Sequence, residues 1–341
     1  MTRRHALPAA PFLAILATRL APGCTDLESM PTGPTLPETG DWTELYTPVA
    51  YTEQLTSVWA MDADDAWFGG SGGVLLHYDG RGITRHDLDT WQPIRDLDGC
   101  ATDEVWGVGY HLAVRWDGRD WTEVPLPDRT RTNTVLCEAP DRVFVAGERH
   151  YYGEPPDYPV ICRWTGHGWK EWELTSGPGE VLEIWRPHAG GPLFAIVEDT
   201  TRHVYRIDDG DWQLMDWRYP PLDADGDLLL LRNDTHDEPG SLYRLEPDHE
   251  LTPICERLER SRILRSRAPM LVFDHALQYT IRCLRRDVLG DTPEDILDAA
   301  VPRRPGPTSN TIFVAGWYGM AMVGTWRPDW TMPVSYTHLR A

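Results

Sequence analysis

The segment Leu97–Val124, LDGCATDEVWGVGYHLAVRWDGRDWTEV, contains three short apolar runs and a fourth strand-like piece. Turn residues separate them at Asp103-Glu104, at Gly109-Tyr110-His111 and at Asp117-Gly118-Arg119-Asp120. Short apolar runs between such turns are typical of antiparallel strands joined by tight connections. The segment therefore predicts a four-stranded antiparallel meander.

Variants of this unit recur along the chain. They are strong in repeats one to three and seven and weaker in between, with two clear strands in the fifth repeat and degraded strands in the sixth. Trp67 and Phe313 occupy equivalent positions six intervals apart, which gives a mean period of about 41 residues and matches the roughly 40–45 residues of one propeller blade. The sequence thus predicts an all-β fold, a β-propeller of seven four-stranded blades over residues 41–334.

The ends of the repeat array predict how the ring closes. An extra fourth-strand motif, Asp41-Trp42-Thr43-Glu44, precedes the first repeat, and in a propeller such a strand can complete a blade from the other end of the chain. The seventh repeat also has a candidate fourth strand of its own at Trp330–Val334, so two alternatives stand.

Two segments interrupt the period. Residues 150–159 lengthen the loop between the second and third strands of the third repeat, and residues 285–310 separate the sixth and seventh repeats. In the second segment, Thr292 can cap a helix whose first position is Pro293. A helix of one to two turns is therefore expected over residues 293–301.

The repeated pattern Val-Trp-x-x-Gly, followed by an aromatic-Asp-Gly turn and a further Trp, resembles that of bacterial extracytoplasmic β-propellers with BNR-like and WD40-like repeats. The turns at Tyr78-Asp79-Gly80 and Trp116-Asp117-Gly118 are similar to Asp-boxes that lack the usual Ser or Thr. The resemblance covers residues 41–333 and implies an architecture, not an activity.

The N-terminal residues predict export. Arg3 and Arg4 precede the apolar stretch Ala6–Thr18, and Leu20–Cys24 resembles a bacterial lipoprotein signal, although its leucine lies four residues before the cysteine. We expect a signal peptide over residues 1–23, lipidation of Cys24, a Pro-rich tether over residues 24–40, and a lipid-anchored position at the bacterial cell envelope. An ordinary secretory signal is the alternative. Residues 335–341 are expected to be a non-native or truncated tail.

Composition limits the partners. The chain of 341 residues carries a formal net charge of −21, which disfavours binding to nucleic acid or to anionic membrane surfaces. The expected partner is an unknown protein or glycan at the cell envelope, and contact with the membrane is expected through the lipid anchor only. No cofactor is indicated.

Five tryptophans recur at repeat-equivalent places and are expected in the core between blades: Trp67, Trp106, Trp121, Trp169 and Trp212. Cys100 and Cys137 occupy near-equivalent first-strand positions of adjacent blades. Packed sheets lie about 10 Å apart, whereas a disulfide needs Cα atoms within about 7 Å. We therefore expect buried free thiols at these positions.

Candidate chemistry is sparse. Asp223–Asp227 has alternating carboxylates like a calcium loop but lacks the later bidentate Glu, so a solvated hairpin turn is favoured. The twelve histidines show no HExxH or similar spacing, and no metal site is predicted. The arginines between Arg257 and Arg267 either bind an anion or form a solvated strand face, and the second reading is favoured. No catalytic pair is evident among the 53 acids.

Two function classes remain: a binding or scaffolding module for a surface protein or glycan, which we favour, and a propeller-fold glycoside hydrolase or lyase. The loops that join second to third strands share one face of a propeller with the connections between blades. Aromatic rings with polar tips gather in these loops and suit a ligand, although they could instead only pack their own loops. The predicted ligand-binding residues, with Asp199 as a further loop acid, are Tyr110, His111, Tyr151, Tyr152, Tyr158, His236, Asp237, Asp274, His275, Trp317 and Tyr318.

Overall fold

The computed structural model is all-β, as predicted. It describes residues 42–45, 47–49, 53–150, 157–175, 177–188, 190–217, 221–225, 228–231, 240–258, 261–264, 271–274, 280–283, 286–287, 296–300, 311–316 and 321–325. Within these ranges the short 3-10 helix η1 (Ser71–Gly73) is the single helical element. None of the described helices is long and apolar enough to cross a membrane.

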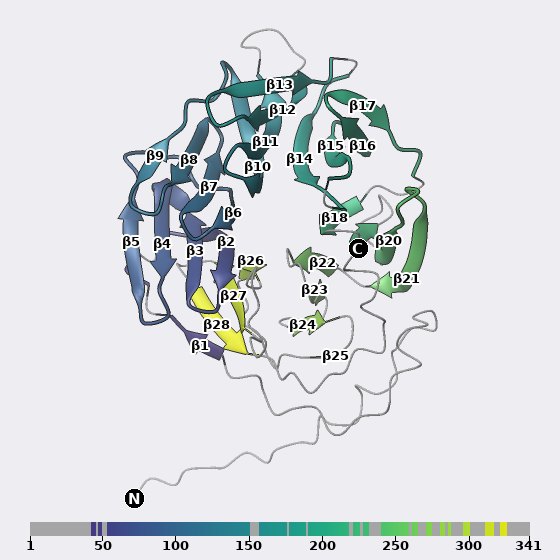
Figure 1. Cartoon of the computed structure of the whole chain (residues 1–341). Coiled ribbons are helices and arrows are strands. Elements are labelled where there is room, and N and C mark those ends of the chain that lie inside the picture. The colour runs from purple at the N-terminus through teal and green to yellow at the C-terminus, as the bar shows by residue number, and fades with distance from the viewer. Residues whose placement is uncertain are drawn as a thin grey trace, which may run out of the picture.

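Seven four-stranded antiparallel sheets surround a central axis, consistent with the seven predicted blades (Figure 1). Blade one comprises β2 (Leu55–Asp62), β3 (Asp65–Gly70), β4 (Val74–Tyr78) and β5 (Ile83–Asp87). Blade two comprises β6 (Asp96–Ala101), β7 (Glu104–Gly109), β8 (Leu112–Trp116) and β9 (Trp121–Glu123). Blade three comprises β10 (Thr130–Ala139), β11 (Arg142–Arg149), β12 (Tyr158–Trp164) and β13 (Trp169–Glu173).

The next three blades repeat this order, with the first strand of each nearest the axis in Figure 1. Blade four comprises β14 (Glu180–Trp185), β15 (Leu193–Glu198), β16 (Arg202–Asp208) and β17 (Asp211–Leu214). Blade five comprises β18 (Pro221–Asp225), β19 (Leu228–Leu231), β20 (Gly240–Leu245) and β21 (Leu251–Leu258). Blade six comprises β22 (Ser261–Leu264), β23 (Leu271–Asp274), β24 (Thr280–Cys283) and β25 (Arg286–Asp287).

Blade seven joins the two ends of the described chain. It consists of β26 (Ile296–Ala300), β27 (Thr311–Gly316), β28 (Ala321–Thr325) and, as its outer strand, β1 (Trp42–Glu44). The register pairs Trp42 with Gly324 and Glu44 with Met322. The predicted closure by residues 41–46 is thus confirmed, because β1 occupies the place beside β28; the rival strand at 330–334 lies outside the described residues.

The helix predicted over residues 293–301 is wrong. Ile296–Ala300 instead forms the inner strand β26, in which Asp298 pairs with Ala315 and Ala300 with Phe313. An isolated helix of two turns is marginal in water because few backbone hydrogen bonds offset its nucleation. A strand paired along β27 gains its hydrogen bonds from the sheet, so the tertiary context decides this segment.

The glycine that follows an aromatic residue by three positions, Trp in blades one and two and Phe in blade three, has a steric cause. A Cβ atom at Gly70, Gly109 or Gly147 would lie 2.3, 2.4 or 2.0 Å from a backbone oxygen of Gln54, Pro93 or Arg131, respectively. Gln54 and Pro93 lie just before the inner strand of the same blade, and Arg131 lies near the start of the inner strand β10. The second strand can therefore approach that segment closely only where the side chain is absent.

The core lies between blades, where apolar side chains of neighbouring sheets interdigitate. Trp67 and Trp106 are fully buried. Trp121 and Trp169 pack against the clusters between blades one and two and between blades two and three, and Trp212 packs against the cluster between blades three and four. The five repeated tryptophans are therefore inter-blade core residues, as predicted.

The cysteines that the structure describes with their side chains, Cys100, Cys137 and Cys162, are free thiols, as predicted, although Cys100 is half-buried and not buried. The distance argument for Cys100 and Cys137 was too simple, because the two thiols share a hydrogen bond between blades two and three. That hydrogen bond, together with burial, raises the pKa of the Cys137 thiol. Burial raises the pKa of the Cys162 thiol to about 12, so both sulfurs are held protonated and inert at neutral pH.

Candidate functional site

One face of the ring carries the loops between second and third strands together with the connections between blades. At the boundary of blades two and three, Thr132 at the start of a new blade donates its backbone N–H to the Tyr110 oxygen over 2.9 Å. His111 donates its backbone N–H to Oε1 of Gln92, in the connection between β5 and β6, over 2.8 Å. These contacts place both kinds of segment on one surface, which we call the loop face.

Two exposed aromatic rings mark the loop face. Trp91 is 84% exposed and Tyr110 is 43% exposed. Among the described residues, Leu214 is the one other large hydrophobic side chain that is exposed. The Arg95 guanidinium carbon lies 4.1 Å from the centre of the Tyr110 ring, which is a cation–π contact. We call Trp91, Arg95 and Tyr110 the aromatic patch.

The loop beneath Tyr110 is held firmly although its ring is exposed. Thr132 Oγ1 donates to the Gly109 oxygen, and the His111 ring nitrogen Nδ1 lies 3.1 Å from the Thr130 oxygen. Arg95 also donates to Oδ1 of Asn133. An exposed ring on a fixed backbone loses little conformational entropy when a partner binds, so the patch is pre-organised for contact.

A second cluster lies on the same face at blade three. Glu148 lies at the end of β11, His150 directly follows that strand, and Asp157 immediately precedes β12. His150 Nδ1 lies 2.8 Å from Asp157 Oδ2. Arg131 donates to Glu148 Oε1 over 2.9 Å. We call Glu148, His150 and Asp157 the blade-three cluster.

The structure brings together some of the predicted binding residues. Tyr110 and His111 lie in one loop as expected, and Tyr158 begins β12 beside the blade-three cluster, half-buried and paired with Arg149. Asp199 lies in the β15–β16 loop and accepts the Thr201 backbone N–H, which lowers the pKa of its carboxyl. Asp274 ends β23, with its side chain outside the described part. Tyr151, Tyr152, His236, Asp237, His275, Trp317 and Tyr318 lie outside the described residues.

The sequence interpretation missed Trp91 and Arg95. A signal was present, because Trp91 falls in the connection between two repeats and not at one of the repeat-equivalent tryptophan positions. A tryptophan that the repeat does not require for its core is a candidate for an external contact.

The opposite face offers charge and structural turns. Asp79 Oδ1 accepts the backbone N–H groups of Arg81 and Gly82, both over 2.9 Å, and Asp117 Oδ1 accepts those of Arg119 and Asp120 at the same distance. These hydrogen bonds lower the pKa of both aspartates. Each carboxylate closes its own turn, as Asx turns do.

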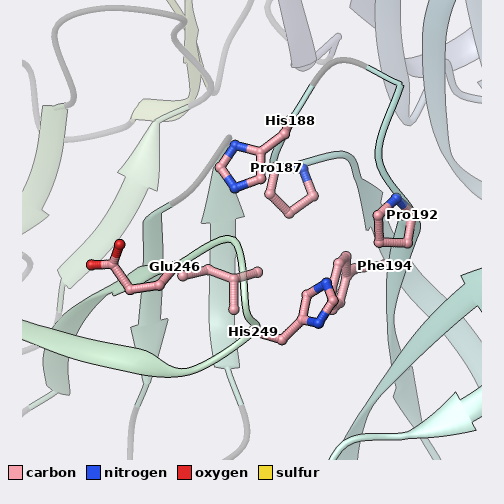
Figure 2. A pocket seen from close by; sticks show the side chains of 7 residues that line it. Pro187, His188, Pro192, Phe194, Glu246 and His249 are labelled. Atoms are coloured by element: carbon pink, nitrogen blue, oxygen red, sulfur yellow. The ribbon is translucent and has the colours of Figure 1, made fainter. Parts of the chain in front are cut away.

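A small apolar pocket also lies on this opposite face, between the turn before β15 and the turn before β21 (Figure 2). Phe194 and His249 face each other there, with ring centres 5.8 Å apart, while the Glu246 carboxylate is directed away from them. Its cavity volume is about 10 Å³, about what a single water molecule needs. It is therefore too small to be a ligand site.

Carboxylates near the axis serve contacts between blades. On the inner strand β6, Asp96 Oδ2 accepts the Val135 backbone N–H of β10 over 2.8 Å, and Asp98 Oδ2 accepts that of Cys137 over 2.6 Å. Asn133 Nδ2 donates to Glu180 Oε2 and to the Val181 oxygen of the next blade over 2.8 and 2.9 Å. Asp96 and Asp98 thus hold β6 to β10 and do not form a pair placed for acid–base work.

Comparison with known proteins assigns the fold. No protein-family model matches the chain, and no curated protein matches it. Among solved structures, the chain is similar to one described as YCF48 bound to D1 peptide, at 14% identity and a TM-score of 0.57, covering 86% of this chain and 99% of that one.

Two other solved structures show the same likeness. YCF48 from Cyanidioschyzon merolae matches at 14% identity and a TM-score of 0.52, over 84% of this chain and 99% of that one. The Cps50 (Swd1) β-propeller domain of Myceliophteria thermophila matches at 12% identity and a TM-score of 0.57, over 83% and 99%. These likenesses establish a β-propeller and leave the activity to be argued from the site.

Proposed function

We propose that this chain is an exported, lipid-anchored binding propeller that holds an extended segment of a partner protein against the loop face. The observation that carries the proposal is the aromatic patch, in which an almost fully exposed Trp91 and a pre-organised Tyr110 are the chain neighbours of Gln92 and His111, which are hydrogen-bonded to each other. Tryptophan, tyrosine and arginine are the residues that most often dominate protein–protein contacts.

The engagement of the described acids supports binding over catalysis. Glu104 is bound to Arg115 and Trp106, while Asp96 and Asp98 are bound to backbone N–H groups of the next blade. A glycoside hydrolase needs two carboxylates that are free to exchange protons or attack the substrate. These carboxylates instead serve the fold.

Structural neighbours add a precedent for the mode of action. Two of the similar structures are YCF48 bound to D1 peptide and BBS1N in complex with ARL6DN, so propellers of this general shape carry peptides or proteins. For the present chain, an envelope protein is the partner that fits the proposed export.

A glycan is the second candidate ligand, because the flat exposed ring of Trp91 also suits the apolar face of a sugar. A loop face with two aromatic rings separated along the chain favours an extended peptide that contacts both. The two ligand classes are separated by the following experiment.

The test is a selection of twelve-residue peptides from a random phage-display library on the full chain, run beside a glycan array. Selected peptides are then measured by fluorescence polarisation against the parent and against Trp91→Ala with Tyr110→Ala. Removal of an anchor ring costs about 2 kcal/mol, so we expect each ring to contribute at least about a thirtyfold change in Kd. Leu214→Ala, which removes the third exposed hydrophobic side chain, is the matched control and should bind as the parent does.

Peptides that bind the double variant as tightly as the parent would show that the aromatic patch is not the docking site. Ligands found on the glycan array alone, and lost in the double variant, would replace the peptide by a sugar at the same patch. Melting curves of all variants establish that the ring remains folded.

A further inference from the structure

The blade-three cluster brings an imidazole and two carboxylates to one point. Their candidate ligand atoms all lie within 4.8 Å of one another. The side chains of Glu148, His150 and Asp157 are 16%, 21% and 26% exposed, so the cluster is largely shielded yet open to solvent on one side. Among the described residues this is the one group of three such side chains that meets these distances.

The sheet itself creates this arrangement. Glu148 lies in β11 and His150 directly follows its last residue, Arg149. The two residues are two apart along an extended chain, so their side chains leave it on the same face. Arg149 pairs with Tyr158, which places His150 opposite Asp157. The cluster therefore follows from strand register.

Backbone hydrogen bonds fix both sides of the cluster. The His150 N–H donates to the Arg129 oxygen, and the Asp157 oxygen accepts the Gly179 N–H, each over 2.9 Å. Both contacts reach into neighbouring connections on the loop face. The cluster thus sits on a rigid rim, a condition for specific ion binding.

The distances come close to those around a bound cation. His150 Nδ1 and Asp157 Oδ2 are 2.8 Å apart, at hydrogen-bond distance. Two ligands of a tetrahedral ion with bonds of about 2.1 Å lie about 3.4 Å apart, so these two side chains need to separate by roughly 0.6 Å to bind it. Arg131 occupies Oε1 of Glu148 and leaves Oε2 for an ion. Carboxylates that bind metals commonly have such a hydrogen-bonding partner, because it fixes their orientation.

We propose that Glu148, His150 and Asp157 bind a divalent transition-metal ion, with Zn²⁺ preferred. The ion takes the place of the proton between His150 Nδ1 and Asp157 Oδ2, and the neutral imidazole then carries its one proton on Nε2. A proton leaves to solvent only from an imidazolium, which would carry one on each ring nitrogen. One imidazole nitrogen with two carboxylate oxygens selects Zn²⁺ and then Mn²⁺ over Ca²⁺, which prefers six to eight oxygen ligands. Further positions on the ion are left for water or for a partner's side chain.

The test is calorimetric titration of Zn²⁺, Mn²⁺ and Ca²⁺ into the full chain after removal of metal with EDTA. We expect one Zn²⁺ per chain, weaker binding of Mn²⁺ and the weakest binding of Ca²⁺. His150→Gln and Asp157→Asn should each weaken Zn²⁺ binding by at least about tenfold. Zn²⁺ should raise the melting temperature of the parent by more than that of these variants.

His203→Gln is the matched control. His203 also has a carboxylate neighbour, Asp199, with Nε2 and Oδ1 3.7 Å apart, but it belongs to no described three-ligand cluster. Its Zn²⁺ affinity should equal that of the parent. Should His150→Gln or Asp157→Asn fail to fold, Glu148→Gln, whose amide oxygen still accepts from Arg131, carries the test.

Three results would overturn the proposal: no saturable Zn²⁺ binding by the parent, Zn²⁺ binding that survives in all the cluster variants, or Ca²⁺ binding as tight as that of Zn²⁺. In the first case, the three side chains are an ordinary hydrogen-bonded cluster. These outcomes do not depend on the aromatic patch, so a failure of the metal-site proposal and a failure of the proposed peptide docking can be distinguished.

Discussion

Each of the first four blades sets an aromatic ring of its second strand opposite a histidine or arginine of its third strand. The pairs are Trp67–His77, Trp106–Arg115, Phe144–Arg163 and Phe194–Arg206. The Trp67 and His77 rings stack with centres 4.4 Å apart. Cross-strand pairs of this kind contribute roughly 0.2–1 kcal/mol each. The first four blades thus share this contact between second and third strands, even where the paired residues differ.

Blade two extends this pair with a buried acid. Glu104 accepts from Trp106 Nε1 over 2.7 Å and from Nε and Nη2 of Arg115 over 2.8 and 2.6 Å. These hydrogen bonds raise the pKa of Arg115. In blade one, Asp65 holds His77 in the same way over 2.8 Å.

Replacement of Glu104 by Ala should lower the free energy of unfolding by about 2–3 kcal/mol. Breaking a buried ion pair costs about 3–5 kcal/mol, and the partial exposure of Arg115 reduces this loss. Urea unfolding curves measure the change. Asp120→Ala, an exposed acid of the same blade, is the control and should stay within about 0.5 kcal/mol of the parent. Equal stability of the two variants would contradict the structural role of Glu104.

The sequence placed Glu104 in a turn, because acids are common there, and its burial becomes evident only from the partner on β8. Trp91 could have been found as a tryptophan out of step with the repeat. The blade-three cluster could not, since its members meet only through the register of β11 and β12 across a long connection. Site residues set by pairing between strands are the hardest to predict from spacing.

At the scale of elements, the strands of blades one to four were predictable because apolar residues alternate between turn residues. The extended segment of blade seven was not. Thr292 and Pro293 are a valid helix start in local terms, but the vacant inner place beside β27 makes residues 296–300 a strand. Helix-start residues determine the secondary structure of a segment only where every neighbouring strand already has its partners.

The outer strand β1 should be required for a stable ring. A chain that starts at residue 41 keeps β1, whereas a chain that starts at residue 53 loses both β1 and Leu45. Leu45 donates its backbone N–H to the Ala321 oxygen and packs on the apolar cluster of blade one. The shorter chain should melt at a lower temperature and self-associate, because the edge of β28 is left unpaired. Melting curves and light scattering after size exclusion measure both effects.

A synthetic peptide of residues 41–52 is the control for this truncation. Added in excess, it should restore the melting temperature of the shorter chain by pairing with β28. A shorter chain as stable as the longer one, with no response to the peptide, would show that three strands suffice for blade seven.

At the scale of the whole molecule, the ring presents two unlike faces. The loop face carries the aromatic patch and the blade-three cluster, and the opposite face carries turns closed by aspartates such as Asp79 and Asp117. With a net charge of −21, the molecule repels acidic surfaces. The choice among the remaining partners then depends on the few apolar contacts of the aromatic patch.

The proposed lipid anchor predicts where the molecule resides. Cys24→Ser should move the protein from the membrane fraction to the soluble fraction and abolish labelling by radioactive palmitate in a bacterial host. Cys100→Ser changes a propeller cysteine instead and should keep both the label and the membrane association. Membrane association that persists unchanged in Cys24→Ser would refute the anchor.

The pairing of β1 with β28 also gives the ring a mechanical weak point. Any tension that reaches the chain ahead of Trp42 is transmitted first to the three residue pairs that join Trp42, Thr43 and Glu44 to Gly324, Val323 and Met322. Longer strand pairings elsewhere, such as that between β10 and β11, bear load only after β1 has separated from β28. Stretching should therefore release the short strand β1 and leave the other six blades and their loop face intact. The β1–β28 pairing thus limits how much of the ring unfolds under force.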